Sequence, residues 1–202
     1  MVYNNIIKGV DKFMNLNLKE EWINGVHLMS PRPQLNHMEI EQAMFKEFDK
    51  YFHGRCRVAI ETSLFLTKDN PKDIKSDLSK LKELISGKKS EIVPDIAVYC
   101  DDNQRFRRGY IGIPQIIVEV LSPSNSDDDT LIKKDTYESY GVPEYWILSP
   151  MNKTATIYEL ENNRYVRKSR INFLENLMKS NKFNDLVVDI RNIELFDEDT
   201  EI

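Results

Sequence analysis

Two acidic residues lie inside apolar segments that otherwise have the composition of buried strands. Asp95 follows Pro94 in IVPDIAVY, and Glu119 interrupts the apolar run IIVEVL. A buried carboxylate is costly unless it is paired, protonated or bound to a cation. If the two segments are neighbouring strands, Asp95 and Glu119 can share a hard cation such as Mg²⁺ or Mn²⁺, which prefers oxygen ligands. The sequence therefore indicates a metal site, to which the backbone carbonyl of Val120 could add a ligand.

A third charged residue, Lys133, is predicted to point toward the same site. The segment from about Asp127 to Tyr140 has helical character, and at about 100° per residue Lys133 shares one arc with Tyr137. Lys134 falls on the opposite arc, where we expect it in solvent. A lysine directed toward two carboxylates could orient or help deprotonate an attacking water and stabilise charge on a phosphate. A structural ion pair is the alternative, and periodicity leaves both open.

The segments that must position these residues alternate between strand-like and helical patterns. Runs rich in β-branched and aromatic residues predict strands at 57–66, 92–99, 115–121, 144–148 and 154–160. An amphipathic helix is predicted from Asn36, as its N-cap, to about Gly54, and a turn at Asn24–Gly25 divides the extended segment 21–29. This order predicts one α/β domain over residues 1–202, with a mixed central β-sheet flanked by helices.

The composition is that of a globular protein. The chain has 202 residues, 41% hydrophobic and 30% charged, which suffices for one core. No apolar run reaches the roughly 18 to 20 residues of a membrane span, and the N-terminus lacks a signal-peptide pattern, so we expect a cytoplasmic protein. Cys56 and Cys100 have no ligand-like spacing, and we expect buried thiols. The net charge of -5 argues against a broad nucleic-acid-coating surface, but not against a local basic groove.

Longer strings around the acidic residues resemble a known family. VPDIAVY and PQIIVEVLSPSNSDDDTLIKKDTYESYGVPEYWILSP are similar to the Uma-two family of bacterial endonucleases (domain of unknown function 820), within the PD-(D/E)XK nuclease superfamily, as are EEWINGVHLMSP with His37 and FNDLVVDIRNIELF. The resemblance implies a restriction-endonuclease-like α/β (α+β) fold and catalytic roles for Asp95, Glu119 and Lys133. Many superfamily members carry the lysine two residues after the strand glutamate, where this chain has Leu121. The resemblance implies that the lysine has moved to the helix.

Together these features predict a Mg²⁺- or Mn²⁺-dependent endonuclease that hydrolyses nucleic-acid phosphodiester bonds, with DNA as the expected substrate. Such hydrolysis needs a metal to neutralise developing charge and to lower the pKa of an attacking water. The alternative is a catalytically silent nucleic-acid-binding or protein-interaction module, because a fold does not guarantee activity. A homodimer would suit cleavage of a duplex, since two symmetric sites could each cut one strand.

Four residues are candidates for accessory roles. Glu21 and Glu61 could each supply an extra metal ligand, although a surface or turn carboxylate is the simpler interpretation of both. His37, at the start of the first predicted helix, could contact a phosphate or a ligand carboxylate, or could pack locally. Tyr137 accompanies Lys133 on the helix arc.

Basic residues elsewhere are candidates for phosphate contacts. They are Arg105, Arg107 and Arg108, together with the lysines of a predicted insertion at about 68–90 that contains a short helical patch. Solvated loop charge is the alternative interpretation of all of them.

Overall fold

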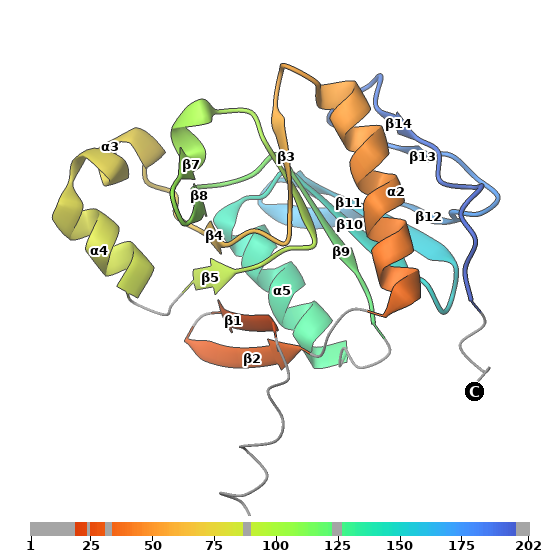
Figure 1. Ribbon diagram of the computed structural model, residues 1–202, viewed down its shortest axis with the longest axis horizontal. Helices are drawn as coiled ribbons and strands as arrows, with labels where there is room; N and C mark the ends of the chain where they lie inside the picture. Colours follow the sequence, from red (N-terminus) through yellow and green to blue (C-terminus); the bar gives the residue numbers. More distant parts are fainter. Residues whose placement is uncertain (1–18, 24, 31–33, 87–89, 123–126, 197–202) are drawn as a thin grey trace, which may run out of the picture.

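Two six-stranded mixed sheets organise the part of the chain that the computed structural model describes, residues 19–23, 25–30, 34–86, 90–122 and 127–196 (Figure 1). The first sheet contains, in spatial order, β2 (Val26–Ser30), β1 (Lys19–Ile23), β5 (Ser90–Ile92), β4 (Leu64–Phe65), β8 (Gly109–Ile111) and β7 (Arg105–Phe106). The second contains β12 (Arg164–Asn172), β11 (Thr154–Glu161), β10 (Glu144–Ser149), β9 (Ile116–Val120), β6 (Ile96–Tyr99) and β3 (Arg57–Ile60). The short strands β13 (Met178–Lys179) and β14 (Val187–Val188) pair separately. The architecture is the mixed α+β fold that was predicted.

The helices are α2 (Leu35–Phe52), α3 (Pro71–Ser76), α4 (Leu78–Ser86) and α5 (Asp127–Tyr140), with the short 3₁₀ helix η1 (Asp102–Gln104). The N-cap of α2 is Gln34, so the prediction of Asn36 was wrong. The Asn36 side chain instead exchanges two hydrogen bonds with the backbone of Phe196, which ties the helix to the C-terminal segment. The segment 68–90 contains α3 as well as the predicted patch at α4.

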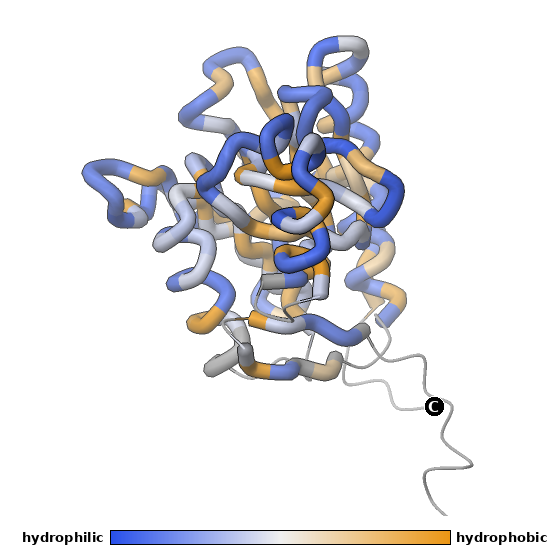
Figure 2. Tube along the Cα trace, turned by 90° about the vertical axis from the view of Figure 1, so that its left-hand side faces the viewer, coloured by the Kyte–Doolittle hydropathy of each residue, from blue (hydrophilic) through white to orange (hydrophobic). Residues whose placement is uncertain are grey.

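The second sheet separates two apolar cores. On one face α2 packs through Ile40, Met44 and Phe48, all fully buried, against strand residues that include Trp146. On the other face lie α5 and the first sheet, whose core includes Tyr137. In Figure 2 the hydrophobic stretches gather in the middle of the molecule, while the outer turns are mostly hydrophilic. The face that α5 covers is therefore a packed interface rather than a solvent-facing sheet surface.

Two predicted strands are each broken where the chain passes from one sheet to the other. Segment 57–66 divides into β3 and β4 around Glu61, whose φ is 39°, and segment 92–99 divides into β5 and β6 around Pro94 and Asp95. Pro94 has no N–H to complete a ladder, which favours a break there. The two breaks meet, because the N–H of Glu61 donates to the carbonyl of Asp95 at 3.0 Å. Asp95 therefore lies at the junction of the two sheets, not inside a strand as predicted.

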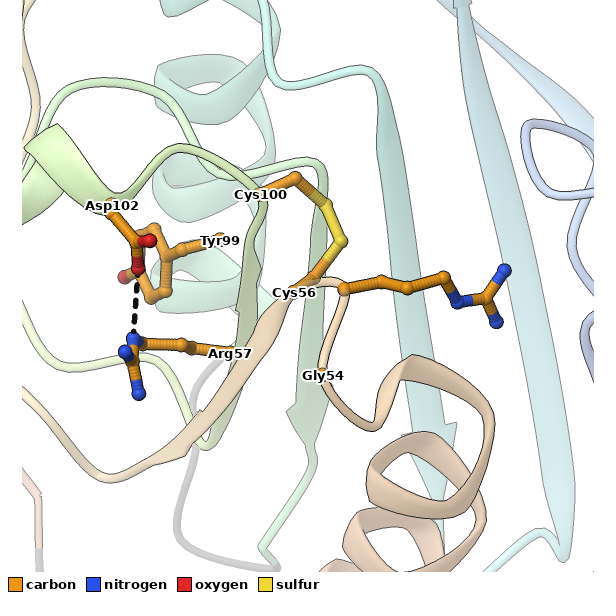
Figure 3. Close-up of a pocket in the computed structure, with 7 residues that line it drawn as sticks. Gly54, Cys56, Arg57, Tyr99, Cys100 and Asp102 are labelled. Atoms are coloured by element: carbon orange, nitrogen blue, oxygen red, sulfur yellow. Dashed lines mark hydrogen bonds and ion pairs between the residues drawn. A yellow bond between two sulfur atoms is a disulfide. The ribbon is translucent and has the colours of Figure 1, made fainter.

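A disulfide joins Cys56 to Cys100, so the expectation of two free, buried thiols was wrong (Figure 3). The antiparallel register of β3 and β6 pairs Arg57 with Tyr99, and one further step places the two cysteines opposite each other, with Cα atoms 4.2 Å apart. Cys100 is exposed and Cys56 is half-buried. The 44-residue separation concealed this pairing, because only the strand register brings the cysteines together.

The ends of the chain were predicted in part. The N-terminal hairpin is confirmed as β1 and β2, although Asn24 of its predicted turn lies outside the described residues, as do residues 1–18. Within the described residues, the closing segment from Phe183 contains the short strand β14. None of the helices within the described ranges is long and apolar enough to cross a membrane.

Candidate active site

The two acidic residues of the sequence pattern lie side by side at the junction of the sheets. Strands β6 and β9 are antiparallel with Ile96 opposite Val118, and continuing this register by one residue brings Asp95 beside Glu119. The backbone N–H of Val120 donates to Asp95 Oδ2 at 2.7 Å. Asp95 and Glu119 are only 3% and 5% exposed. Since alternate strand residues share a face, Glu119 points with Ile117 toward α5.

Helix α5 supplies two partners to Glu119. The Nζ atom of Lys133 lies 3.0 Å from Glu119 Oε2, and the hydroxyl of Tyr137 donates to Glu119 Oε1 at 2.7 Å. Lys133 and Tyr137 are one helical turn apart and therefore face the same way. The predicted arc is thus confirmed for both residues.

Glu21 on β1 completes the group of buried charges. Its Oε2 lies 2.9 Å from Lys133 Nζ, and its Oε1 accepts the backbone N–H of Val93 at 2.8 Å. Only 1% of Glu21 is exposed, so the interpretation as a surface carboxylate was wrong. The fully buried Ile23 lies on the same face of β1, and that alternation is the one local signal that could have indicated an inward glutamate.

The charges in this group determine the protonation of its members. Burial alone would lower the pKa of the Lys133 ammonium, but the carboxylates of Glu119 and Glu21 raise it above its ordinary value, and Asp95 acts in the same direction. Burial, together with the neighbouring Glu119 carboxylate, raises the pKa of the Tyr137 phenol. The site therefore presents a cationic Lys133 and a neutral, hydrogen-bond-donating Tyr137.

Two further accessory candidates border Asp95. His37, in the first turn of α2, places Nε2 3.6 Å from Asp95 Oδ2, and both side chains are buried. Glu41 lies one turn further along α2 and is also buried. The Glu61 side chain is exposed, and the contact of Glu61 with the site is the backbone hydrogen bond to Asp95. The structure thus brings His37 to the site by its side chain and Glu61 only by its main chain.

The donor set fits a hard divalent cation, although no group of three His, Cys, Asp or Glu side chains in the described ranges forms a ready metal cluster. Asp95 and Glu119 provide carboxylate oxygens, the ligands that Mg²⁺ and Mn²⁺ prefer. The N–H of Val120 faces Asp95, and in a strand the carbonyl of the same residue points to the same side. Here the ammonium of Lys133 is the positive charge that balances Glu119 and Glu21.

Lys134 was predicted to point into solvent, and the structure shows that it does so only in part. Its side chain is half-buried, and its Nζ lies 4.8 Å from the centre of the Tyr158 ring. The reason is that the outer face of α5 is covered in part by β11 and β12, where Arg164 pairs with Glu138 at 2.8 Å. The two lysines nevertheless differ in their partners, since only Lys133 contacts the buried carboxylates.

The arginines predicted to contact phosphate are exposed and lie away from Asp95. Arg105 and Arg107 line a surface pocket with Arg57 and Asp102, beside a second pocket of about 160 Å³ at the disulfide (Figure 3). These pockets flank the C-terminal end of β6, roughly 16 Å from Asp95 at about 3.3 Å per strand residue. Arg108 lies 3.7 Å from Glu91 and over the ring of Phe65. The structure therefore does not gather these arginines around the carboxylates.

Comparison with known proteins places the chain in a family. The Uma2 family, described as "Putative restriction endonuclease", matches residues 10–191. The fold is similar to the crystal structure of "a putative nuclease belonging to DUF820" from Anabaena variabilis ATCC 29413, with a TM-score of 0.60 and 17% identity over 82% of this chain and 83% of that chain. No curated protein matches the chain. Since the family match spans most of the chain, this protein belongs to the Uma2 family.

Proposed function

We propose that this protein is a metal-dependent endonuclease that cleaves DNA. The observation that carries the proposal is the buried group in which Asp95, from the break between β5 and β6, meets Glu119 of β9 and Lys133 of α5. Buried, mutually perturbed ionisable groups are typical of functional sites. Membership of a family of restriction endonucleases supports the same activity.

Asp95 and Glu119 would hold Mg²⁺ or Mn²⁺, with the carbonyl of Val120 as a further oxygen ligand. A divalent cation bound there supplies a Lewis acid for the phosphate and lowers the pKa of an attacking water. Asp95 is prepared for this role by the N–H of Val120, which orients its carboxylate. His37 stands beside the same oxygen and would limit how that carboxylate turns.

Lys133 would stabilise the negative charge that develops on the phosphate. As an ammonium it donates hydrogen bonds, so its role is electrostatic and orienting rather than that of a base. Tyr137 would hold Glu119 in place by the hydrogen bond to Oε1, leaving Oε2 directed toward Lys133. The proposal thus assigns Lys133 to orientation and charge stabilisation.

Cleavage of defined substrates tests the proposal. The purified protein is incubated with supercoiled plasmid, linear duplex, single-stranded DNA and RNA, each with Mg²⁺, Mn²⁺ or a chelator. We expect nicking or linearisation of the plasmid with either metal and none with the chelator. Binding of nucleic acid without cleavage under every condition would favour the catalytically silent module, and cleavage of RNA alone would contradict DNA as the substrate.

A further inference from the structure

We propose that Glu21 is a positioning residue, which holds the ammonium of Lys133 so that Glu119 can give its carboxylate to the cation. The inference rests on the proposed function, because it assigns a task within the same site. It concerns a residue of the N-terminal hairpin, far in sequence from the strand and helix that carry the other charged groups.

Glu21 is held in place from both sides. One oxygen accepts the N–H of Val93 at 2.8 Å, and the other lies 2.9 Å from the ammonium of Lys133. Strand β1 is also paired with β2 along its length and with β5 at Trp22 and Ile23, so its backbone has little freedom to shift. With both oxygens engaged, Glu21 is arranged to bind the lysine rather than to reach a cation beside Asp95.

The lysine competes with a cation for Glu119. The ammonium lies 3.0 Å from Glu119 Oε2, an oxygen that a metal bound between Asp95 and Glu119 would draw upon. Removing one partner of a buried charge is costly when no other partner remains. Because Glu21 is a second anionic partner, Lys133 keeps a counter-charge while Glu119 turns to the metal. Without Glu21, Glu119 would be the one carboxylate among the described residues that forms an ion pair with the lysine.

Four proteins form the test, namely the parent, Glu21→Gln, Lys133→Met and the double variant, with Mn²⁺ affinity measured by calorimetry. The glutamine keeps an oxygen that can accept from Val93, so the substitution removes the charge and little else. Glu21→Gln should weaken Mn²⁺ binding roughly 10- to 100-fold, as for loss of a partner that orients a metal ligand. In the Lys133→Met background the same change should alter affinity by no more than about twofold, because the competing ammonium is gone.

A neighbouring glutamate provides the matched control. Glu20 precedes Glu21 on β1 but has a side chain that is 62% exposed, 3.4 Å from His27. Glu20→Gln should leave Mn²⁺ affinity unchanged. Should Glu21→Gln fail to fold, Glu21→Asp repeats the cycle, because its carboxylate keeps the charge but is too short to reach Val93 and Lys133 together.

Three results overturn the inference. If Glu21→Gln lowers Mn²⁺ affinity equally in the parent and in Lys133→Met, Glu21 is a metal ligand. If it lowers the affinity in neither protein, Glu21 is a structural carboxylate. If the parent does not bind Mn²⁺, there is no metal ligand for Glu21 to free from Lys133. As a second readout, Glu21→Gln should lower kcat for DNA cleavage and leave KM unchanged. The calorimetry does not require cleavage activity. If the four proteins show the predicted Mn²⁺ affinities but the parent cleaves no nucleic acid, the proposed function is refuted and the inference about Glu21 stands.

Discussion

The charged side chains at the two ends of β6 differ in burial. At the end next to Asp95, which precedes the strand, the carboxylates are buried and linked to Lys133 and to backbone N–H groups. At the other end the ion pair of Arg57 and Asp102 is exposed, and a disulfide ties β6 to β3. Buried charges add little to stability and often mark function, whereas a disulfide stabilises chiefly by restricting the unfolded chain. Under the proposed function, one end of the strand serves chemistry and the other serves stability.

The largest expected effect is at the buried end. Asp95→Asn and Glu119→Gln each keep a hydrogen-bond acceptor but remove a charge from the donor set. Each should lower the rate of metal-dependent cleavage roughly 1000-fold or more, since a metal contributes several kcal/mol to transition-state stabilisation. Initial rates on plasmid DNA measure this, with circular dichroism as the control for folding. Cleavage at the parent rate by either variant would show that the buried charges are not the catalytic group.

The next effect separates two adjacent lysines on α5. Lys133→Met should lower the cleavage rate roughly 100-fold, as expected for a positioned charge-stabilising group. Lys134→Met removes the contact with the Tyr158 ring and a positive charge near Glu138, neither of which involves the buried carboxylates. It should therefore leave the rate unchanged and cost about 0.5–1 kcal/mol of unfolding free energy at most. Parallel assays of rate and of urea unfolding give both quantities. Equal losses of rate in the two variants would mean that contact with the buried carboxylates does not decide function.

At the disulfide end the expected effect is on stability and not on the cleavage rate. Replacing Cys56 and Cys100 together by serine should lower the unfolding free energy by about 3–4 kcal/mol, given their sequence separation of 44. The folded variant should cleave DNA at the parent rate, because the disulfide lies at the end of β6 opposite to Asp95. Urea unfolding with and without a thiol reductant measures the change, and the serine variant should not respond to the reductant. Loss of cleavage below the melting transition would show that the two ends are coupled.

The smallest effect is expected for the exposed ion pair. Arg57→Gln or Asp102→Asn should change the unfolding free energy by less than about 1 kcal/mol, because solvent screens a pair in which the side chains are 49% and 88% exposed. The double variant gives their coupling energy, which added salt should reduce further. A coupling above that range would mean that this end also relies on charge for its stability.

The sequence predicted the features that depend on local pattern. Glu119 stood out because it interrupts an apolar run, and the turn of the helix put Lys133 and Tyr137 on one face. Both inferences need only neighbouring residues, so they did not depend on the arrangement of the sheets. The hairpin at β1 and β2 was predictable for the same reason.

The features that depend on long-range pairing were missed. The disulfide and the inward position of Glu21 follow from how β3 meets β6 and how β1 meets β5, and no spacing in the sequence records those registers. The strand breaks at Glu61 and Pro94 were missed because strand-like apolar residues lie on both sides of each break, although the two sides belong to different sheets. The prediction that Lys134 lies in solvent was wrong because the helical periodicity of α5 cannot show that β11 and β12 cover part of the helix face opposite the site.

The central claim is that Asp95 and Glu119 share a divalent cation, and a crystal soaked with Mn²⁺ tests it most directly. The anomalous difference map should show one strong peak within about 2.0–2.3 Å of a carboxylate oxygen of each residue, as for hard cations bound by oxygen ligands. The peak should disappear in crystals of Asp95→Asn. A peak elsewhere, or no peak at saturating Mn²⁺ in a lattice that leaves the site open, would contradict the account.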